Sequence, residues 1–186
     1  MTSLPALWLP ILLSAVLVFV ASSIIHMASP WHKNDFPRLS NQDQVMDALR
    51  PLAIPPGDYL MPRPTSREEM RSPQFTEAMT RGPVVMMTVM PNGPMSMGRN
   101  LAQWFVYCLV VSLLSAYVAS RALAPAARFA DVFRFASTTA LLAYAAALWQ
   151  MSIWYRRAWS ITVKATVDGL LYAAITGAII AWLWPK

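Results

Sequence analysis

The residues with the clearest chemical potential lie in a methionine-rich stretch near the middle of the chain. Residues 84–98 read VVMMTVMPNGPMSMG and contain five methionines. Thioether sulfur is a soft ligand that suits Cu(I). A turn at residues 91–94 would make Met90 and Met95 cross-strand partners, and strand alternation would add Met86 and Met97 to the same face. This pattern predicts a candidate copper site.

The same stretch has a second interpretation, in which the methionines only pack. Val84, Val85 and Val89 make the stretch apolar on both faces, as in a strand that is covered on both sides. Methionine fills irregular apolar gaps readily because its side chain is flexible. The covered surface would then be the bilayer interface, the surrounding segment or another protein.

One ionisable residue lies inside the long apolar blocks of the chain, and it is Asp168. Ionisable groups at membrane depth are functional candidates. We expect Asp168 in the first turn of its helix, where it can pair with Lys164 four residues earlier or with Arg156 or Arg157. A proton relay would need further carboxylates or histidines deeper in the membrane, and the sequence supplies none. Interfacial ion pairing is therefore the predicted role.

Other reactive side chains give little support for catalysis. Cys108 lies within an apolar block, where a lone thiol packs as a small apolar group. His26 and His32 flank the exit of the first block, and we interpret them as interfacial residues. The sequence contains no glycine-rich phosphate loop, paired cysteines or nucleophile elbow. We expect a protein that is not an enzyme and that carries no cofactor.

Composition indicates a membrane protein. Hydrophobic residues make up 56% of the 186 residues and charged residues 13%, against about 25% charged in soluble domains. The apolar residues form blocks of about the length that one helix needs to cross a bilayer, and a chain in lipid must be helical there. We predict an all-α membrane protein with four transmembrane helices, at residues 4–27, 101–120, 135–155 and 165–184.

The first block is interpreted as a retained anchor and not as a cleaved signal peptide. A signal peptide has basic residues before a short apolar core. Here no Lys or Arg precedes the block, and the apolar run is longer than such a core.

The segment between the first two blocks, residues 28–100, is predicted to lie outside the membrane as a proline-rich cap. Short helices are expected at residues 41–50 and 67–81, with a break at Pro73 inside the second. A β-hairpin is expected in the methionine-rich stretch, followed by Asn100 as the cap of the next membrane helix. The chain thus divides into a first helix (1–27), a cap (28–100) and a three-helix region (101–186).

Small residues recur every four positions along the fourth block. Such a stripe lets a neighbouring helix approach closely, and van der Waals packing then drives association. The neighbour can belong to the same bundle, to another membrane subunit or to a second copy of the chain. The stripe is formed by Gly169, Ala173, Gly177 and Ala181.

Basic residues suggest an orientation. The side of the membrane that carries the cap has eleven Lys and Arg residues and the opposite side has four, which favours a cytoplasmic cap. The net charge of +6 calls for no nucleic acid, since basic residues beside membrane helices meet anionic lipid head groups.

Four segments of the chain resemble a family of small bacterial membrane proteins that has no assigned activity. The resemblance implies a multi-pass protein of the bacterial inner membrane and supplies no catalytic residue. The segments read SPWHK (residues 29–33), IPPGDY (54–59), MPNGPMSMG (90–98) and WQMSIWYRR (149–157).

Three functions are compatible with these features. The leading hypothesis is a non-enzymatic accessory or scaffold subunit of a membrane complex, because the helices carry small-residue stripes and no catalytic constellation. The alternatives are a copper-handling protein that uses the methionines, and a carrier of a small molecule or lipid with its site between the helices. A deep cavity with polar lining would favour the carrier.

Overall fold

The computed structural model describes residues 2–186 and divides into two units. The first, which we call the bundle, comprises Met1–Pro37 and Ser96–Lys186, and the second, the cap, comprises Arg38–Met95. The cap is thus a separate compact unit, inserted in the sequence between the first two helical stretches of the bundle.

Four stretches of the described chain are long and apolar enough to cross a membrane, so the predicted all-α membrane fold is confirmed. The first runs from Leu4 to Ala28. It is composed of η1 (Leu4–Leu7), α1 (Trp8–Ser23) and a π-helical turn, η2 (Ile24–Ala28). The second is α5 (Met97–Ala122), and the third combines α6 (Phe129–Tyr144), η4 (Ala146–Leu148) and α7 (Trp149–Ile153). The fourth is α8 (Trp159–Trp182).

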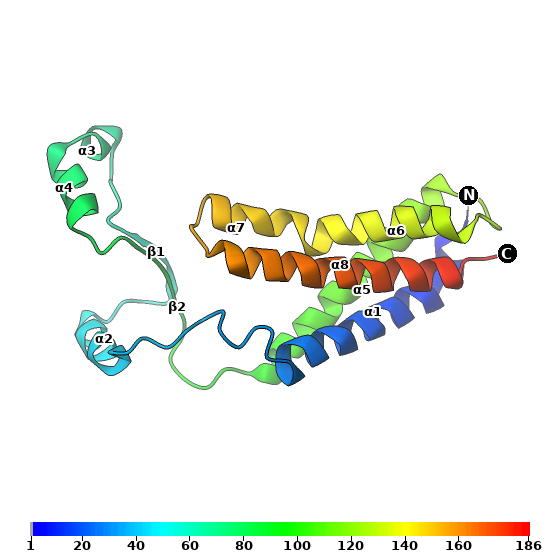
Figure 1. The fold of residues 1–186 in the computed structure, drawn as a ribbon, viewed down its shortest axis with the longest axis horizontal. Helices are drawn as coiled ribbons and strands as arrows, with labels where there is room; N and C mark the ends of the chain where they lie inside the picture. Colours follow the sequence, from blue (N-terminus) through cyan, green and yellow to red (C-terminus); the bar gives the residue numbers. More distant parts are fainter. Residues whose placement is uncertain (1) are drawn as a thin grey trace. The chain divides into compact units, whose positions relative to one another are not determined.

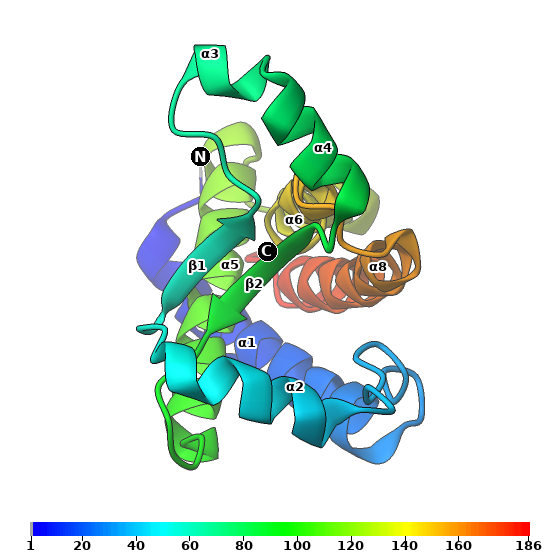
Figure 2. The same ribbon diagram turned by 90° about the vertical axis from the view of Figure 1, so that its left-hand side faces the viewer.

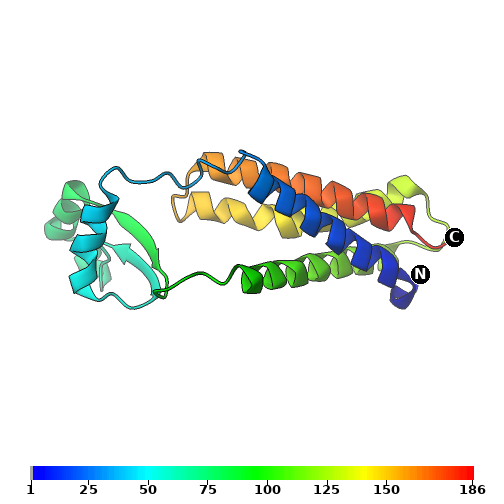
Figure 3. The ribbon, with the colours of Figure 1, turned by 90° about the horizontal axis from the view of Figure 1, so that it is seen from below.

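Helices α6 and α8 lie side by side in opposite directions, and α1 crosses α5 (Figures 1 and 3). Two glycines permit the close approach of α8 to α6. A Cβ atom on Gly169 would lie 2.8 Å from the Cβ of Ala145, and one on Gly177 would lie 2.7 Å from the Cβ of Ser137. The predicted small-residue stripe is buried and lies inside the bundle; its members are Gly169, Ala173, Gly177 and Ala181.

The start of α1 and the end of α8 lie at one end of the bundle, which we call the closed end (Figure 1). The C-terminal segment is fastened there to the loop between α5 and α6. The Trp184 Nε1–H donates to the Ala124 carbonyl over 3.0 Å, and the Ala126 amide donates to the Pro185 carbonyl over 2.9 Å. The core of this end consists of Leu7, Ile11, Ala116, Ala119, Val132, Ala136, Ile180, Ala181 and Trp184.

Two helix starts differ from the prediction. Helix α5 begins at Met97 and its N-cap is Ser96, whose Oγ accepts from the Arg99 amide over 3.4 Å, so the prediction of Asn100 as the cap is wrong. Helix α8 begins at Trp159, earlier than predicted, because polar residues continue the helix beyond its apolar block. Asp168 therefore lies in the third turn of α8, about 14 Å from the helix start and not in the first turn.

The cap contains short helices and one pair of strands. Its elements are α2 (Gln42–Leu49), η3 (Arg50–Leu52), β1 (Gly57–Met61), α3 (Arg67–Met70), α4 (Pro73–Arg81) and β2 (Val85–Val89). The predicted break at Pro73 is confirmed, since α3 ends before it and α4 starts on it. Ser66 and Ser72 cap these two helices with their side-chain oxygens.

The predicted β-hairpin in the methionine-rich stretch is wrong. Strand β2 pairs antiparallel with β1, with Tyr59 opposite Met87, and the connection between the two strands contains α3 and α4 (Figure 2). Residues 90–96 form no strand. Pro91 and Pro94 have no amide to donate to a ladder, whereas β1 offers a complete antiparallel partner.

Candidate functional site

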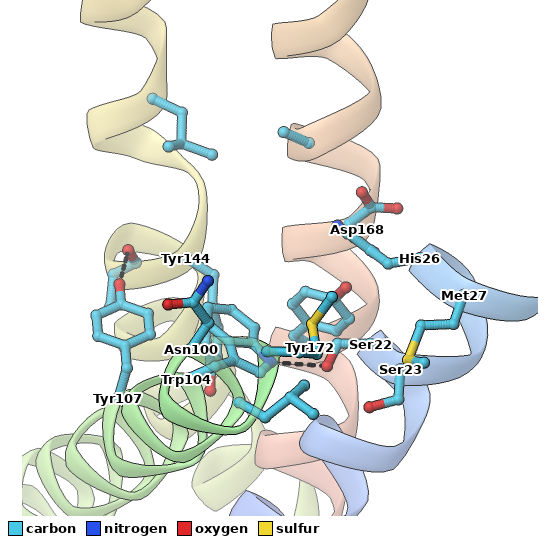
Figure 4. Close-up of a pocket in the computed structure, with 15 residues that line it drawn as sticks. Ser22, Ser23, His26, Met27, Asn100, Trp104, Tyr107, Tyr144, Asp168 and Tyr172 are labelled. Atoms are coloured by element: carbon cyan, nitrogen blue, oxygen red, sulfur yellow. Dashed lines mark hydrogen bonds between the residues drawn. The ribbon is translucent and has the colours of Figure 1, made fainter. Parts of the chain in front are cut away.

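A cavity of about 640 Å³ lies in the bundle where α1 ends and α5 and α8 begin. We call this region the open end. Helix α5 diverges there from α6 and α8 (Figure 3). Side chains from all four membrane-length stretches line the cavity (Figure 4). The volume falls within the range of small-molecule sites, about 300–1,000 Å³.

Aromatic rings form much of the wall. They are Trp104 and Tyr107 from α5, Tyr144 from α6 and Tyr172 from α8. The Trp104 ring centroid lies 6.2 Å from those of both Tyr144 and Tyr172, and the two tyrosine centroids are 5.5 Å apart. Edge-to-face contacts of this kind hold the rings in defined orientations. The wall is therefore a fixed aromatic surface.

Two of these rings are held by hydrogen bonds to other helices (Figure 4). The Trp104 Nε1–H donates to Ser22 Oγ over 2.7 Å, which ties α5 to α1. The Tyr107 hydroxyl donates to the Ala143 carbonyl over 2.7 Å, which ties α5 to α6.

The hydroxyls of Tyr144 and Tyr172 behave differently, because neither has a hydrogen-bond partner within residues 2–186. Both residues line the cavity and are only 6% and 4% exposed. A buried polar group without a partner costs about 1–3 kcal/mol. The hydroxyl oxygens are almost fully covered by neighbouring atoms, so a molecule in the cavity reaches them only after the tyrosine side chains move.

A cluster of ionisable side chains borders the cavity. His26 from η2 and Asp168 from α8 lie next to each other at its edge (Figure 4). His32 Nδ1 lies 2.6 Å from Asp35 Oδ2, and His32 Nε2 lies 2.8 Å from Asp168 Oδ2. The rings of His26 and His32 have centroids 4.3 Å apart. One ligand atom each from His26, His32 and Asp168 lies within 4.8 Å of the other two.

Lys164 completes the cluster from α8. Its Nζ donates to Asp35 Oδ1 over 2.6 Å and to the Trp31 carbonyl over 2.8 Å. The hydrogen bonds from Lys164 and then from His32 lower the pKa of the Asp35 carboxyl, which outweighs the opposite effect of burial. Asp35 is therefore a carboxylate at neutral pH.

The predicted pairing of Asp168 with Lys164 or the arginines is wrong. The chain after η2 brings His32 and Asp35 against α8, so that His32 contacts Asp168 and Asp35 contacts Lys164. Arg156 and Arg157 take part in no ion pair in the described part of the chain. The sequence pattern suggested Lys164 as the partner of Asp168 because it precedes Asp168 by one turn of the helix. In the structure, the segment after η2 provides His32 as the partner instead.

The four candidate methionines do not form the predicted face. Met86 lies on β2 opposite Leu60 of β1, while Met90 and Met95 lie outside the strands. Met97 is the first residue of α5 and lines the cavity of the bundle. The cross-strand geometry that suggested a copper site is therefore not present in the pairing of β2.

Several residues of the site were missed by the sequence analysis. His26 and His32 were interpreted as interfacial, and Asp35 was not considered. Their spacing around the exit of the first helix could have suggested a cluster with Asp168, the one carboxylate inside an apolar block. Tyr144 and Tyr172 gave no signal, since aromatic residues near the ends of membrane helices are typical of interfacial belts.

The chemistry of the site has to be argued from its own residues. No protein-family model, curated protein or solved structure matches this chain. The aromatic wall suits the apolar body of a ligand, and the ionisable cluster at the edge of the cavity suits polar groups.

Proposed function

We propose that the protein binds a small amphipathic molecule from the membrane in the cavity of the bundle and acts as a carrier or binding protein for it. The observation that carries the proposal is the combination of a cavity of about 640 Å³ with an aromatic wall and a cluster of ionisable side chains at its edge. An aromatic wall without such polar groups would support apolar packing alone.

The lining indicates the kind of molecule. Trp104, Tyr107 and the two buried tyrosines offer flat faces to a ring or to a chain with double bonds. Polar atoms of the molecule can form hydrogen bonds with His26, Asn100 or Asp168, which line the cavity with polar side chains. A lipid-soluble molecule with an unsaturated or aromatic body and a hydrogen-bonding end meets both requirements.

The test has two parts. The bound molecule is recovered together with the protein, and a larger side chain is then placed in the cavity to exclude it. The full chain is extracted from its membrane in native-lipid nanodiscs and analysed by native mass spectrometry. We expect one adduct of defined mass per chain. Ala165→Leu should abolish it, because Ala165 lines the cavity and the added side chain occupies ligand space.

The matched control is Ala102→Leu, which adds the same atoms at an exposed position of α5 that does not line the cavity. This variant should keep the adduct. A wild-type chain without any adduct, or equal adducts on both variants, would contradict the proposed function.

We further propose that the protein resides in the bacterial inner membrane with the cap and the open end of the bundle on the cytoplasmic side. The support is the resemblance of the four sequence segments and the excess of basic residues on the cap side, eleven against four. A fusion at Lys186 checks the orientation. Alkaline phosphatase should be active there and a cytoplasmic fluorescent protein dark, and the reverse pattern would place the cap outside.

The accessory-subunit hypothesis stays a second proposal with less support. The small-residue stripe that suggested a docking surface is covered by α6, since Gly169 and Gly177 leave no room for a Cβ atom there. The exposed apolar side chains of the membrane helices match contact with lipid. Co-purification of another membrane protein in a fixed ratio would restore this hypothesis.

A further inference from the structure

We propose that His26, His32 and Asp168 bind a divalent transition-metal ion at the edge of the cavity, and that Asp35 and Lys164 hold His32 in position for it. This inference goes beyond the proposed binding of an amphipathic molecule and does not depend on it.

The ligand set matches this class of ion. Two imidazoles and one carboxylate are typical ligands of Zn²⁺ and of Fe²⁺ and its neighbours, whereas Ca²⁺ and Mg²⁺ prefer oxygen alone. Metal–ligand bonds of roughly 2.0–2.2 Å in a tetrahedral zinc site separate the ligand atoms by roughly 3.3–3.5 Å. The three candidate atoms lie within 4.8 Å of one another, and His32 Nε2 and Asp168 Oδ2 are 2.8 Å apart. The ligand atoms therefore have to shift by at most roughly 1.5 Å relative to one another to surround one ion.

The position of His32 gives a second and independent reason. Both nitrogens of its ring face carboxylate oxygens, Nδ1 toward Asp35 over 2.6 Å and Nε2 toward Asp168 over 2.8 Å. The contact with Asp35 holds the ring on one side. On the other side, a metal ion would take the place that a proton otherwise occupies between Nε2 and Asp168 Oδ2.

The resulting chain of contacts has the form that metal sites use. A ligating histidine typically donates its other N–H to a carboxylate, which fixes the tautomer and the orientation of the ring. Asp35 does this for His32, and Lys164 in turn donates to Asp35 over 2.6 Å. Asp35 and Lys164 are therefore positioning residues, whereas His26, His32 and Asp168 are the ligands.

The charges of the cluster also call for a cation. The side chains of Asp35 and Asp168 are each only 7% exposed, and buried carboxylates are costly unless their charge is compensated. Lys164 supplies one positive charge, to Asp35. A cation at His32 Nε2, either a proton or a divalent ion, compensates Asp168.

The proposed ion borders the cavity, because His26 and Asp168 both line it. Three protein ligands leave at least one coordination position for water or for a polar atom of a bound molecule. An ion in this position would act as a Lewis acid toward that atom.

The test uses the full chain in detergent, with any affinity tag removed and metals stripped by a chelator. Zn²⁺ binding is measured by calorimetry, and Co²⁺ binding by the visible absorption that histidine and carboxylate ligands induce. We expect one ion per chain. His26→Gln should weaken Zn²⁺ binding at least about 100-fold, in line with the loss of a ligand.

Two further variants separate a ligand from a structural residue. Asp35→Asn should weaken Zn²⁺ binding by about 10–100-fold and shift the Co²⁺ spectrum while one ion per chain is retained, because it alters the orientation of His32 and removes no ligand. Asp131→Asn, which removes a half-buried carboxylate at the closed end, should change neither property.

His26 is exposed, so its replacement leaves the fold intact even where Asp168→Asn would not. Thermal unfolding of His26→Gln checks this point. Absence of saturable Zn²⁺ binding by the wild-type chain, or equal binding by wild type and His26→Gln, would overturn the proposal.

Discussion

The two ends of the bundle are built from the same four membrane-length stretches but differ in what fills the space between them. At the closed end, small and branched apolar side chains are fully buried, among them Leu7, Ala119 and Val132. At the open end, aromatic rings that contact one another line a cavity, and several ionisable groups border it.

With the proposed function, the difference separates the end that assembles the protein from the end that binds the ligand. In lipid, helices associate through close van der Waals packing, and the closed end and the close contact between α6 and α8 provide it. Polar and ionisable groups at membrane depth are expensive and contribute little to assembly. The ionisable side chains His26, His32 and Asp168 gather at the open end, as a binding site requires. The following experiments probe the contrast between the two ends.

The largest loss of stability is expected from Gly177→Ala, at the close contact between α6 and α8 that we call the α6–α8 seam. The new Cβ would lie 2.7 Å from the Ser137 Cβ and 3.1 Å from the Phe133 carbonyl oxygen, so the helices must separate. We expect the free energy of unfolding to fall by about 2–3 kcal/mol. The control is Gly98→Ala, where no atom lies within 4 Å of the added Cβ, and thermal unfolding in detergent compares the two. Equal midpoints would show that the seam is looser than described.

A cavity made at the closed end should cost more than one enlarged at the open end. Leu7→Ala removes a fully buried side chain and is expected to cost about 2 kcal/mol. Leu101→Ala widens a cavity that already exists and should cost less than about 0.5 kcal/mol. Denaturant unfolding of both variants measures the difference, and an equal loss would remove the contrast between the two ends.

The ion pair of the open end can be isolated with a double-mutant cycle. Asp35→Asn and Lys164→Met each remove one partner of the 2.6 Å contact. We expect the two losses of stability to be less than additive by about 1–2 kcal/mol, because the second replacement removes a group that the first has already left without its partner. Additive losses would mean that the pair contributes nothing beyond its separate contacts.

The tyrosines of the cavity allow the smallest and sharpest comparison. Tyr107→Phe removes a hydroxyl that donates to the Ala143 carbonyl and should cost about 1 kcal/mol. Tyr172→Phe removes a hydroxyl without a partner in residues 2–186 and should leave the stability of ligand-stripped protein unchanged or slightly higher. Thermal unfolding checks both. A clear loss for Tyr172→Phe would show that its hydroxyl is already satisfied.

The sequence predicted the membrane helices well because apolar blocks of about twenty residues have few other solutions in lipid. Local rules also placed the break at Pro73. The pairing of β1 with β2 was missed, since Gly57 and Val89 are partners across two intervening helices. Non-local pairing leaves no signal in a short window of sequence.

The site was less predictable than the fold. Asp168 was identified as a candidate from its place in an apolar block, but its partner was wrong because the path of the loop after η2 decides which side chains reach it. Whether the hydroxyls of Tyr144 and Tyr172 find a hydrogen-bond partner depends on how α6 and α8 pack against the rest of the bundle. Such a property appears only when the helices are packed together.

The central claim is that the open end binds a molecule, and ligand-linked stability tests it most directly. Wild-type chain stripped of bound molecules is unfolded thermally before and after addition of the total lipid extract of its native membrane, beside Ala165→Leu and Ala102→Leu. Wild type and Ala102→Leu should gain stability, by about 2.7 kcal/mol when the bound molecule is present at a hundred times its Kd, and Ala165→Leu should gain none. An equal gain in all three proteins would show that bulk lipid stabilises the bundle and would contradict binding in the cavity.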